Sequence, residues 1–145
     1  MDERRVGFEL RCATNLFKRK VASRKPPELE ESTGIHGWAL KYFCEHQDQD
    51  VFQKDFEAHF SIRRSTATNM LKLMETNGLI LRESVPYDAR LKKITLTPKA
   101  IALHKRIEHH IEISEKAIRK DITDEELEVF FSVMDKIKKN LEELE

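Results

Sequence analysis

The chain has 145 residues, of which 39% are apolar, 36% are charged and only four are glycine. This length fits one domain, and the composition predicts long, solvated helices that gain part of their burial by oligomerisation. The formal net charge is zero, so bulk charge gives no argument for a polyanionic partner.

Cysteine use and hydropathy indicate the cellular compartment. Cys12 and Cys44 form no CxxC pair, and the amino terminus lacks the apolar run of a signal peptide. No window approaches the roughly 18 uninterrupted apolar residues that a membrane-spanning helix needs. We therefore expect a cytoplasmic protein with reduced cysteines and no membrane segment.

Two amphipathic helices are predicted in the first third of the chain. Apolar side chains recur at helical spacing from about residue 3 to residue 21, and the helix stops before Pro26-Pro27, because a residue that precedes proline leaves the α region. Ser32 or Thr33 then caps a second helix. Its apolar side, which is typical of a core, comprises Ile35, Trp38, Ala39, Tyr42 and Phe43.

A helix-turn-helix is predicted next, from a short helix at about 52–59, a turn near 60–62 and a fourth helix that ends at Gly78. Glycine can adopt the left-handed conformation that closes a helix. One face of the fourth helix is apolar, with Ala67, Met70, Leu71 and Met74. The side chains that project elsewhere are polar or basic, namely Arg63, Arg64, Ser65, Thr66, Thr68, Asn69 and Lys72.

A projecting hairpin follows the helix-turn-helix. We predict strands at Leu79–Glu83 and Lys92–Thr95, joined by a charged loop at Val85–Leu91 that is too long for a tight turn. A hairpin in this position is a wing.

Two further helices complete the chain. Thr97 and Pro98 predict the start of a fifth helix that runs to about Lys120, and Thr123 with Glu126 fits a capping box for a sixth. Apolar residues in the sixth helix recur in steps of three and four, which predicts packing on another helix. This seam comprises Leu127, Phe130, Met134, Ile137, Leu141 and Leu144.

Positive charge gathers between residues 61 and 97, where seven basic side chains stand against three acidic ones. Short hydroxyl and amide side chains lie between them. This chemistry suits a surface that meets phosphates and base edges.

The sequence resembles the MarR family of bacterial winged-helix transcription regulators. The resemblance rests on four consecutive motifs, which are residues 65–68 (STAT), residues 73–80 (LMETNGLI), residues 88–90 (DAR) and residues 96–100 (LTPKA). Each motif is weak alone, but their order and spacing are specific. Arg63 stands where many members have a capping serine or threonine.

The resemblance implies a mainly α fold with a small β-hairpin wing, in which a winged helix-turn-helix core is joined to amino- and carboxy-terminal dimerisation helices. It implies a single domain at 1–145, with the winged helix-turn-helix at about 32–97 and helical dimerisation regions at about 1–25 and 98–145. Two chains would form a homodimer through the first, fifth and sixth helices. The expected interface residues are Phe8, Leu16, Leu127, Phe130, Met134, Ile137 and Leu141.

We expect the polar and basic face of the fourth helix, from Arg63 to Lys72, to bind the major groove of double-stranded DNA. Arg90 in the wing is expected in the minor groove, held by Asp88, with Arg82, Lys92 and Lys93 also in the wing interface. A solvated helix face and an ordinary surface salt bridge are the alternatives.

Regulation is less defined by the sequence. His36, Trp38 and Tyr42 lie near the place where family members often form a small-molecule effector pocket, although aromatic stripes at helical spacing are usually core. Cys12 lies on the first helix, where some members place an oxidation-sensing cysteine, but a buried structural cysteine is the plainer interpretation. No histidine pair has the i, i+4 spacing that suits a metal, and no cofactor is expected.

The chain shows no phosphate-binding glycine loop or nucleophile motif, so we predict no enzyme activity. The favoured function is a ligand-responsive repressor that binds a pseudo-palindromic operator as a homodimer. A redox- or metal-sensing regulator of the same fold and a helical interaction protein that does not bind DNA remain the alternatives.

Overall fold

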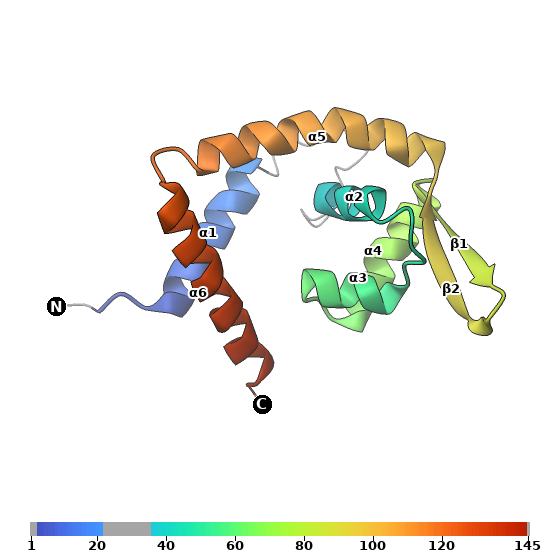
Figure 1. Ribbon diagram of the computed structural model, residues 1–145, viewed down its shortest axis with the longest axis horizontal. Coiled ribbons are helices and arrows are strands. Elements are labelled where there is room, and N and C mark those ends of the chain that lie inside the picture. The colour runs from blue at the N-terminus through green and yellow to red at the C-terminus, as the bar shows by residue number, and fades with distance from the viewer. Residues whose placement is uncertain (1–2, 22–35, 145) are drawn as a thin grey trace. The chain divides into compact units, whose positions relative to one another are not determined.

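The computed structural model describes residues 3–21 and 36–144, except for the side chain of His36. These residues form six helices and one two-stranded antiparallel hairpin (Figure 1). The predicted mainly α fold with a hairpin wing is confirmed. The helices are α1 (Val6–Val21), α2 (His36–Glu45), α3 (Gln53–Phe60), α4 (Arg64–Thr76), α5 (Pro98–Ile118) and α6 (Asp124–Glu142), and the strands are β1 (Ile80–Val85) and β2 (Asp88–Leu96).

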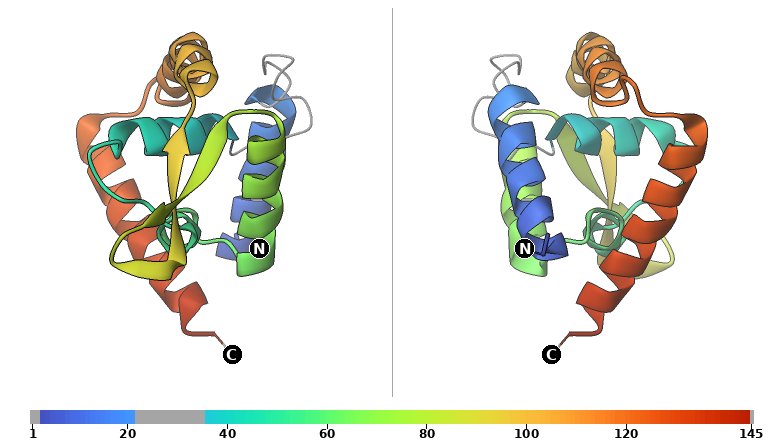
Figure 2. Two further views of the ribbon diagram at one scale, coloured as in Figure 1. Left: turned by 90° about the vertical axis from the view of Figure 1, so that its right-hand side faces the viewer. Right: turned by 90° about the vertical axis from the view of Figure 1, so that its left-hand side faces the viewer.

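The chain divides into two compact units, residues 1–112 and 113–145, with the boundary inside α5. Its hydrophobic core lies in the first unit and draws on α2, α3, α4, the hairpin and the first half of α5. Figure 2 shows the ribbons of these elements from two further directions. The largest fully buried side chains are Leu40, Phe56, Leu71, Met74, Leu79 and Ile80. The predicted cap of the second helix, Ser32 or Thr33, lies outside the described residues.

The helix-turn-helix is built around Phe56 of α3, which is fully buried and stacks on Phe43 of α2 at 5.5 Å between ring centroids. The apolar face predicted for α4 is buried against this cluster. Between α3 and α4, Ser61 takes a left-handed conformation with φ 53°. This conformation turns the chain sharply enough for α4 to pack back on α3.

The end of α4 has the geometry predicted from Gly78. The glycine has φ 72°, its N–H donates to Glu75 O at 3.0 Å, and Leu79 N donates to Met74 O at 2.9 Å. This pair of bonds is a Schellman motif, which satisfies two of the carbonyls left free at a helix end. The chain then enters β1 in a fixed direction.

Thr97 joins the end of the hairpin to α5. Its hydroxyl donates to Gly78 O at 2.6 Å and accepts from Ala100 N at 3.2 Å, while its backbone N–H donates to Leu79 O at 3.1 Å. The predicted cap of α5 is therefore confirmed. Thr97 also ties the start of α5 to the exit of α4.

The predicted loop at Val85–Leu91 is wrong, because the strands continue through most of it. Ile80 pairs with Leu96 and Val85 with Asp88, with a bulge at Ser84/Val85, so only Pro86 and Tyr87 connect the strands. The charged residues of the predicted loop, Asp88 and Arg90, lie within β2, where the Arg90 guanidinium donates to the Asp88 carboxylate.

The two terminal helices carry no buried residue within the described chain. Thr123 caps α6 as predicted, since its hydroxyl accepts from Glu126 N at 3.2 Å and its N–H donates to the Glu126 carboxylate at 2.9 Å. Several large apolar side chains remain exposed, among them Phe8 (66%), Phe130 (52%) and Leu141 (55%).

We expect Thr97→Val to lower the free energy of unfolding by about 1–3 kcal/mol, because valine keeps the shape but removes the cap and leaves the Gly78 carbonyl without this donor. Urea unfolding followed by circular dichroism measures the change. Thr95→Val, in the neighbouring strand position, is the control and should stay within about 0.5 kcal/mol of wild type. Equal stability of both variants would contradict the role given to Thr97.

Candidate nucleic-acid interface

The helix α4 presents the predicted polar and basic side chains to solvent. Thr66 is half-buried, and the others are exposed, namely Arg63, Arg64, Ser65, Thr68, Asn69 and Lys72. The opposite face is fixed in the core through Ala67, Met70, Leu71 and Met74. Because the buried face cannot rotate, the direction of the exposed face is fixed by the core.

The amino terminus of α4 suits an anion. Arg63 is the N-cap residue in an extended conformation, and its own side chain makes no capping hydrogen bond. A helix amino terminus carries partial positive charge from its N–H groups, and Arg63 and Arg64 add two full charges there. This arrangement disfavours the isolated helix end but favours a phosphate placed against it.

Gln53, the first residue of α3, was missed by the sequence analysis. Its side-chain amide donates to Thr68 Oγ1 at 2.8 Å and to Arg64 O at 3.4 Å. It therefore connects the two helices of the helix-turn-helix and orients a candidate base-contacting hydroxyl. The only signal in the sequence was its position at the predicted start of the preceding helix, where a side chain can reach the next helix.

The wing presents Arg90 as predicted. Asp88 accepts three hydrogen bonds from Arg90, one from its backbone N–H at 2.9 Å and two from its guanidinium at 3.2 Å. The Arg90 side chain is nevertheless 90% exposed. Hydrogen bonding to the Arg90 side chain lowers the pKa of Asp88, so Asp88 keeps the charge that orients this guanidinium even in mildly acidic solution.

The other basic side chains of the wing have partners within the chain. Arg82 lies 3.7 Å from a carboxylate oxygen of Glu75, and its Nε is buried, so it connects β1 to the end of α4. Lys92 Nζ donates to Ser84 Oγ at 2.6 Å. Lys93 lies 3.9 Å from Glu83 and 3.9 Å from Asp50. The Arg90 side chain, at 90% exposure, is thus far more accessible than those of Arg82 (28%) and Lys93 (32%).

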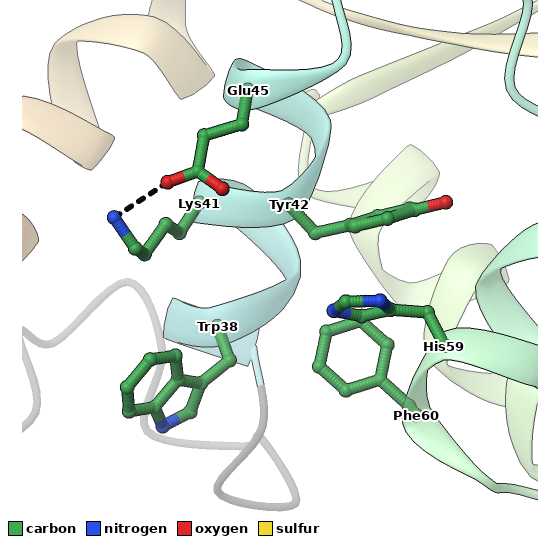
Figure 3. Close-up of a pocket in the computed structure, with 6 residues that line it drawn as sticks. All are labelled: Trp38, Lys41, Tyr42, Glu45, His59 and Phe60. Atoms are coloured by element: carbon green, nitrogen blue, oxygen red, sulfur yellow. Dashed lines mark ion pairs between the residues drawn. The ribbon is translucent and has the colours of Figure 1, made fainter.

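A pocket of about 190 Å³ lies between α2 and α3 (Figure 3). Its lining residues are Trp38, Lys41, Tyr42, Glu45, His59 and Phe60. Two of the predicted effector residues, Trp38 and Tyr42, therefore line one pocket, whereas the side chain of His36 lies outside the described part of the chain. Sequence analysis missed the wall from α3, because residues 59 and 60 are distant in sequence from α2.

The pocket combines aromatic walls with one ion pair. Tyr42 stacks on His59 at 4.3 Å between ring centroids, and Lys41 Nζ lies 2.7 Å from Glu45 Oε1. Hydrogen bonding between them raises the pKa of Lys41 and lowers that of Glu45, so both stay charged. Burial raises the pKa of the Tyr42 phenol, which therefore stays neutral. Such a site suits a flat molecule that carries a polar group.

The remaining candidate groups are scattered. Cys12 is half-buried on α1, and Cys44 is half-buried on α2, where burial and then nearby carboxylates raise the pKa of its thiol. A raised pKa lowers the fraction of reactive thiolate.

Within residues 3–21 and 36–144, no three His, Cys, Asp or Glu side chains lie close enough together to bind a metal ion. In the same ranges, no helix is long and apolar enough to cross a membrane.

The predicted dimer residues lie on the terminal helices and keep part of their surface accessible in the single chain. Phe8, Leu16, Phe130 and Leu141 are exposed, and Leu127, Met134 and Ile137 are half-exposed.

Comparison with solved structures places the fold among transcription regulators. The transcription regulator MarR from Oenococcus oeni PSU-1 is 25% identical, with 93% of this chain and 99% of that chain covered and a TM-score of 0.78. The MepR–DNA complex of S. aureus is also 25% identical, covering 96% and 99%, with a TM-score of 0.80.

A SlyA-like transcription regulator from Listeria monocytogenes, at 24% identity, covers 97% of this chain and 90% of its own with a TM-score of 0.75, and it adds likeness of fold. No family model matches the chain. The near-complete coverage and the winged-helix geometry agree with the four motifs found in the sequence. The chain is similar over nearly its whole length to MarR-type transcription regulators and shares their winged-helix fold.

Proposed function

We propose that the chain is a sequence-specific DNA-binding transcription regulator that acts in the cytoplasm without catalysing a reaction. The observation that carries the proposal is the exposed polar and basic face of α4 beside a wing that presents Arg90 at 90% exposure. The structurally similar MepR is seen in complex with DNA. In this chain, α4 would enter the major groove and Arg90 the adjacent minor groove.

The test uses two DNA duplexes. The wild-type protein selects one from a random-sequence library, and the other comes from the region flanking its own gene. Binding is followed by fluorescence anisotropy at several salt concentrations. A protein that binds scrambled DNA as tightly as the selected duplex is not sequence-specific. Failure to bind any duplex at low salt would overturn the proposal.

Specificity should depend on the exposed face of α4. We expect Arg64→Ala and Asn69→Ala each to lower affinity for the selected duplex by about tenfold or more, because a bidentate contact with a base contributes about 1–3 kcal/mol. Anisotropy titrations measure the change. Lys105→Ala on α5, which also removes an exposed basic side chain, should change affinity little. An equal loss in all three variants would indicate a general charge effect instead.

We further propose that two chains bind a pseudo-palindromic operator as a homodimer. Supporting this, α1 and α6 have no buried residue within the described chain but several exposed apolar side chains. Large apolar side chains that recur at helical spacing along one helix are typical of a helix that packs on a partner. Pairing would place two α4 helices in successive major grooves, about 34 Å apart on one side of the DNA.

Phe130→Glu should convert the dimer to a monomer, because it puts a charge in the middle of the α6 seam. Sedimentation velocity measures the mass, and anisotropy should show a loss of operator affinity of at least about tenfold, since each copy then binds alone. Ser132→Glu, on the opposite face of α6, is the control and should remain dimeric. A dimeric Phe130→Glu protein would place the interface elsewhere.

The pocket between α2 and α3 is our candidate effector site, and repression released by a small molecule is the regulation we propose. A ligand can shift DNA affinity only by binding one arrangement of the protein better than another. The pocket is well suited to measurement, because Trp38 is the single tryptophan of the chain and lies in its wall.

Among small aromatic acids and amines, any compound that lowers operator affinity should change Trp38 emission with the same midpoint. His59→Ala should lower the affinity for that compound several-fold, because it removes the ring stacked on Tyr42. His109→Ala, which removes an exposed imidazole from α5, is the control and should leave this affinity unchanged. An effective compound that leaves Trp38 emission unchanged would place the effector site elsewhere.

A further inference from the structure

The tip of the wing is hydrogen-bonded to the turn that precedes α3. The hydroxyl of Tyr87, one of the two residues connecting β1 and β2, donates to Asp50 Oδ2 at 2.8 Å. Lys93 Nζ lies 3.9 Å from the other oxygen of the same carboxylate. Asp50 therefore holds both the tip and the returning strand of the hairpin.

A backbone contact fixes the same hairpin nearer its base. Ile94 N donates to Val51 O at 2.7 Å, and both residues are buried in the core. An isolated two-stranded hairpin is only marginally stable in water. The bond at Ile94 anchors the hairpin, but the direction of the tip beyond it depends on the contact between Tyr87 and Asp50.

The fastened residue adjoins the pair that presents the wing arginine. Tyr87 directly precedes Asp88, which binds Arg90 through the three hydrogen bonds described above. Fixing the Tyr87 side chain therefore fixes the turn from which Asp88 and Arg90 project. The Tyr87 side chain is exposed, but partial desolvation of its phenol and the hydrogen bond to Asp50 raise the pKa of this group.

We propose that Asp50 is a positioning residue that holds the wing through Tyr87 and Lys93 so that Arg90 meets the minor groove. The proposal rests on the DNA-binding function proposed above and assigns a role to a residue outside the helix-turn-helix and the wing. Asp50 does not touch DNA in this arrangement, and it acts through the residues that it holds.

The direction in which Asp50→Ala changes DNA affinity distinguishes a positioning role from a purely electrostatic effect. Removing a carboxylate near a polyanion reduces repulsion, so electrostatics alone predicts that Asp50→Ala binds DNA more tightly. Positioning predicts weaker binding. Asp48→Ala is a matched control, because it removes the same charge from an exposed residue of the same turn.

We expect Tyr87→Phe and Asp50→Ala each to weaken binding to the selected duplex by about threefold to tenfold, the range that corresponds to loss of one hydrogen bond of typical net strength. Asp48→Ala should bind as tightly as wild type or slightly more tightly. The double variant Asp50→Ala/Tyr87→Phe should lose no more than the stronger single variant, because both act through one contact.

The decisive arm uses Arg90. In an Arg90→Ala background, Tyr87→Phe should have no further effect on affinity, since there is no wing arginine left to position. If Tyr87→Phe lowers DNA affinity as much in the Arg90→Ala protein as in the wild type, the proposal is overturned and Tyr87 has a DNA contact of its own. Affinity unchanged by both Tyr87→Phe and Asp50→Ala, while Arg90→Ala weakens binding, would overturn it and leave the DNA-binding function intact.

A measurement without DNA keeps the proposal independent of that function. Heteronuclear 15N NOE values for residues 84, 85 and 87–90 report picosecond-to-nanosecond order of the wing tip. They should fall in Tyr87→Phe and Asp50→Ala and stay unchanged in Asp48→Ala. Unchanged values in all three variants would show that Asp50 does not hold the tip, and wild-type protein that binds no DNA would overturn the proposed function separately.

Discussion

The base of the wing is joined to α4 at one junction, where Thr97 meets Gly78. The Thr97 hydroxyl donates to Gly78 O and accepts from Ala100 N, so one side chain closes the exit of α4 and opens α5. A side chain at Gly78 would meet no atom within 4 Å, so the constraint is its backbone conformation, φ 72°, rather than space. The hairpin leaves α4 and returns to α5 through these two residues.

Two arginine–carboxylate ion pairs in the wing differ in solvent exposure, and this difference determines whether the arginine can contact another molecule. Arg82 and Glu75 form an arginine–carboxylate pair with the arginine side chain 28% exposed, and the pair connects two elements. Arg90 and Asp88 form a similar pair, but the arginine is 90% exposed and remains available to a partner. Counting basic residues between 61 and 97 could not separate these cases. The exposed positive charge of this region therefore lies mainly on α4 and its N-cap and at Arg90 and Lys92.

Features set by neighbouring residues could be predicted from the sequence, and features set by distant residues could not. Gly78, Thr97 and the Thr123–Glu126 capping box were found correctly because each bond joins residues a few positions apart or follows a backbone preference. The bonds from Gln53 to Thr68 and from Tyr87 to Asp50 join residues 15 and 37 positions apart, and no local pattern marks them. The hairpin was predicted too short because its charged residues Asp88 and Arg90 were taken for a loop, whereas they lie in β2 and bind each other.

Buried residues are distributed unevenly along the chain, and this distribution affects how the proposed regulator would work. Every residue of the buried core belongs to the first unit, while α1 and α6 hold their apolar side chains without burying any within the described residues. If pairing of two chains covers those side chains, dimerisation stabilises the terminal helices, and the stability of that region depends on protein concentration. DNA that binds both copies favours the paired state by the same linkage, so operator binding and dimerisation would strengthen each other.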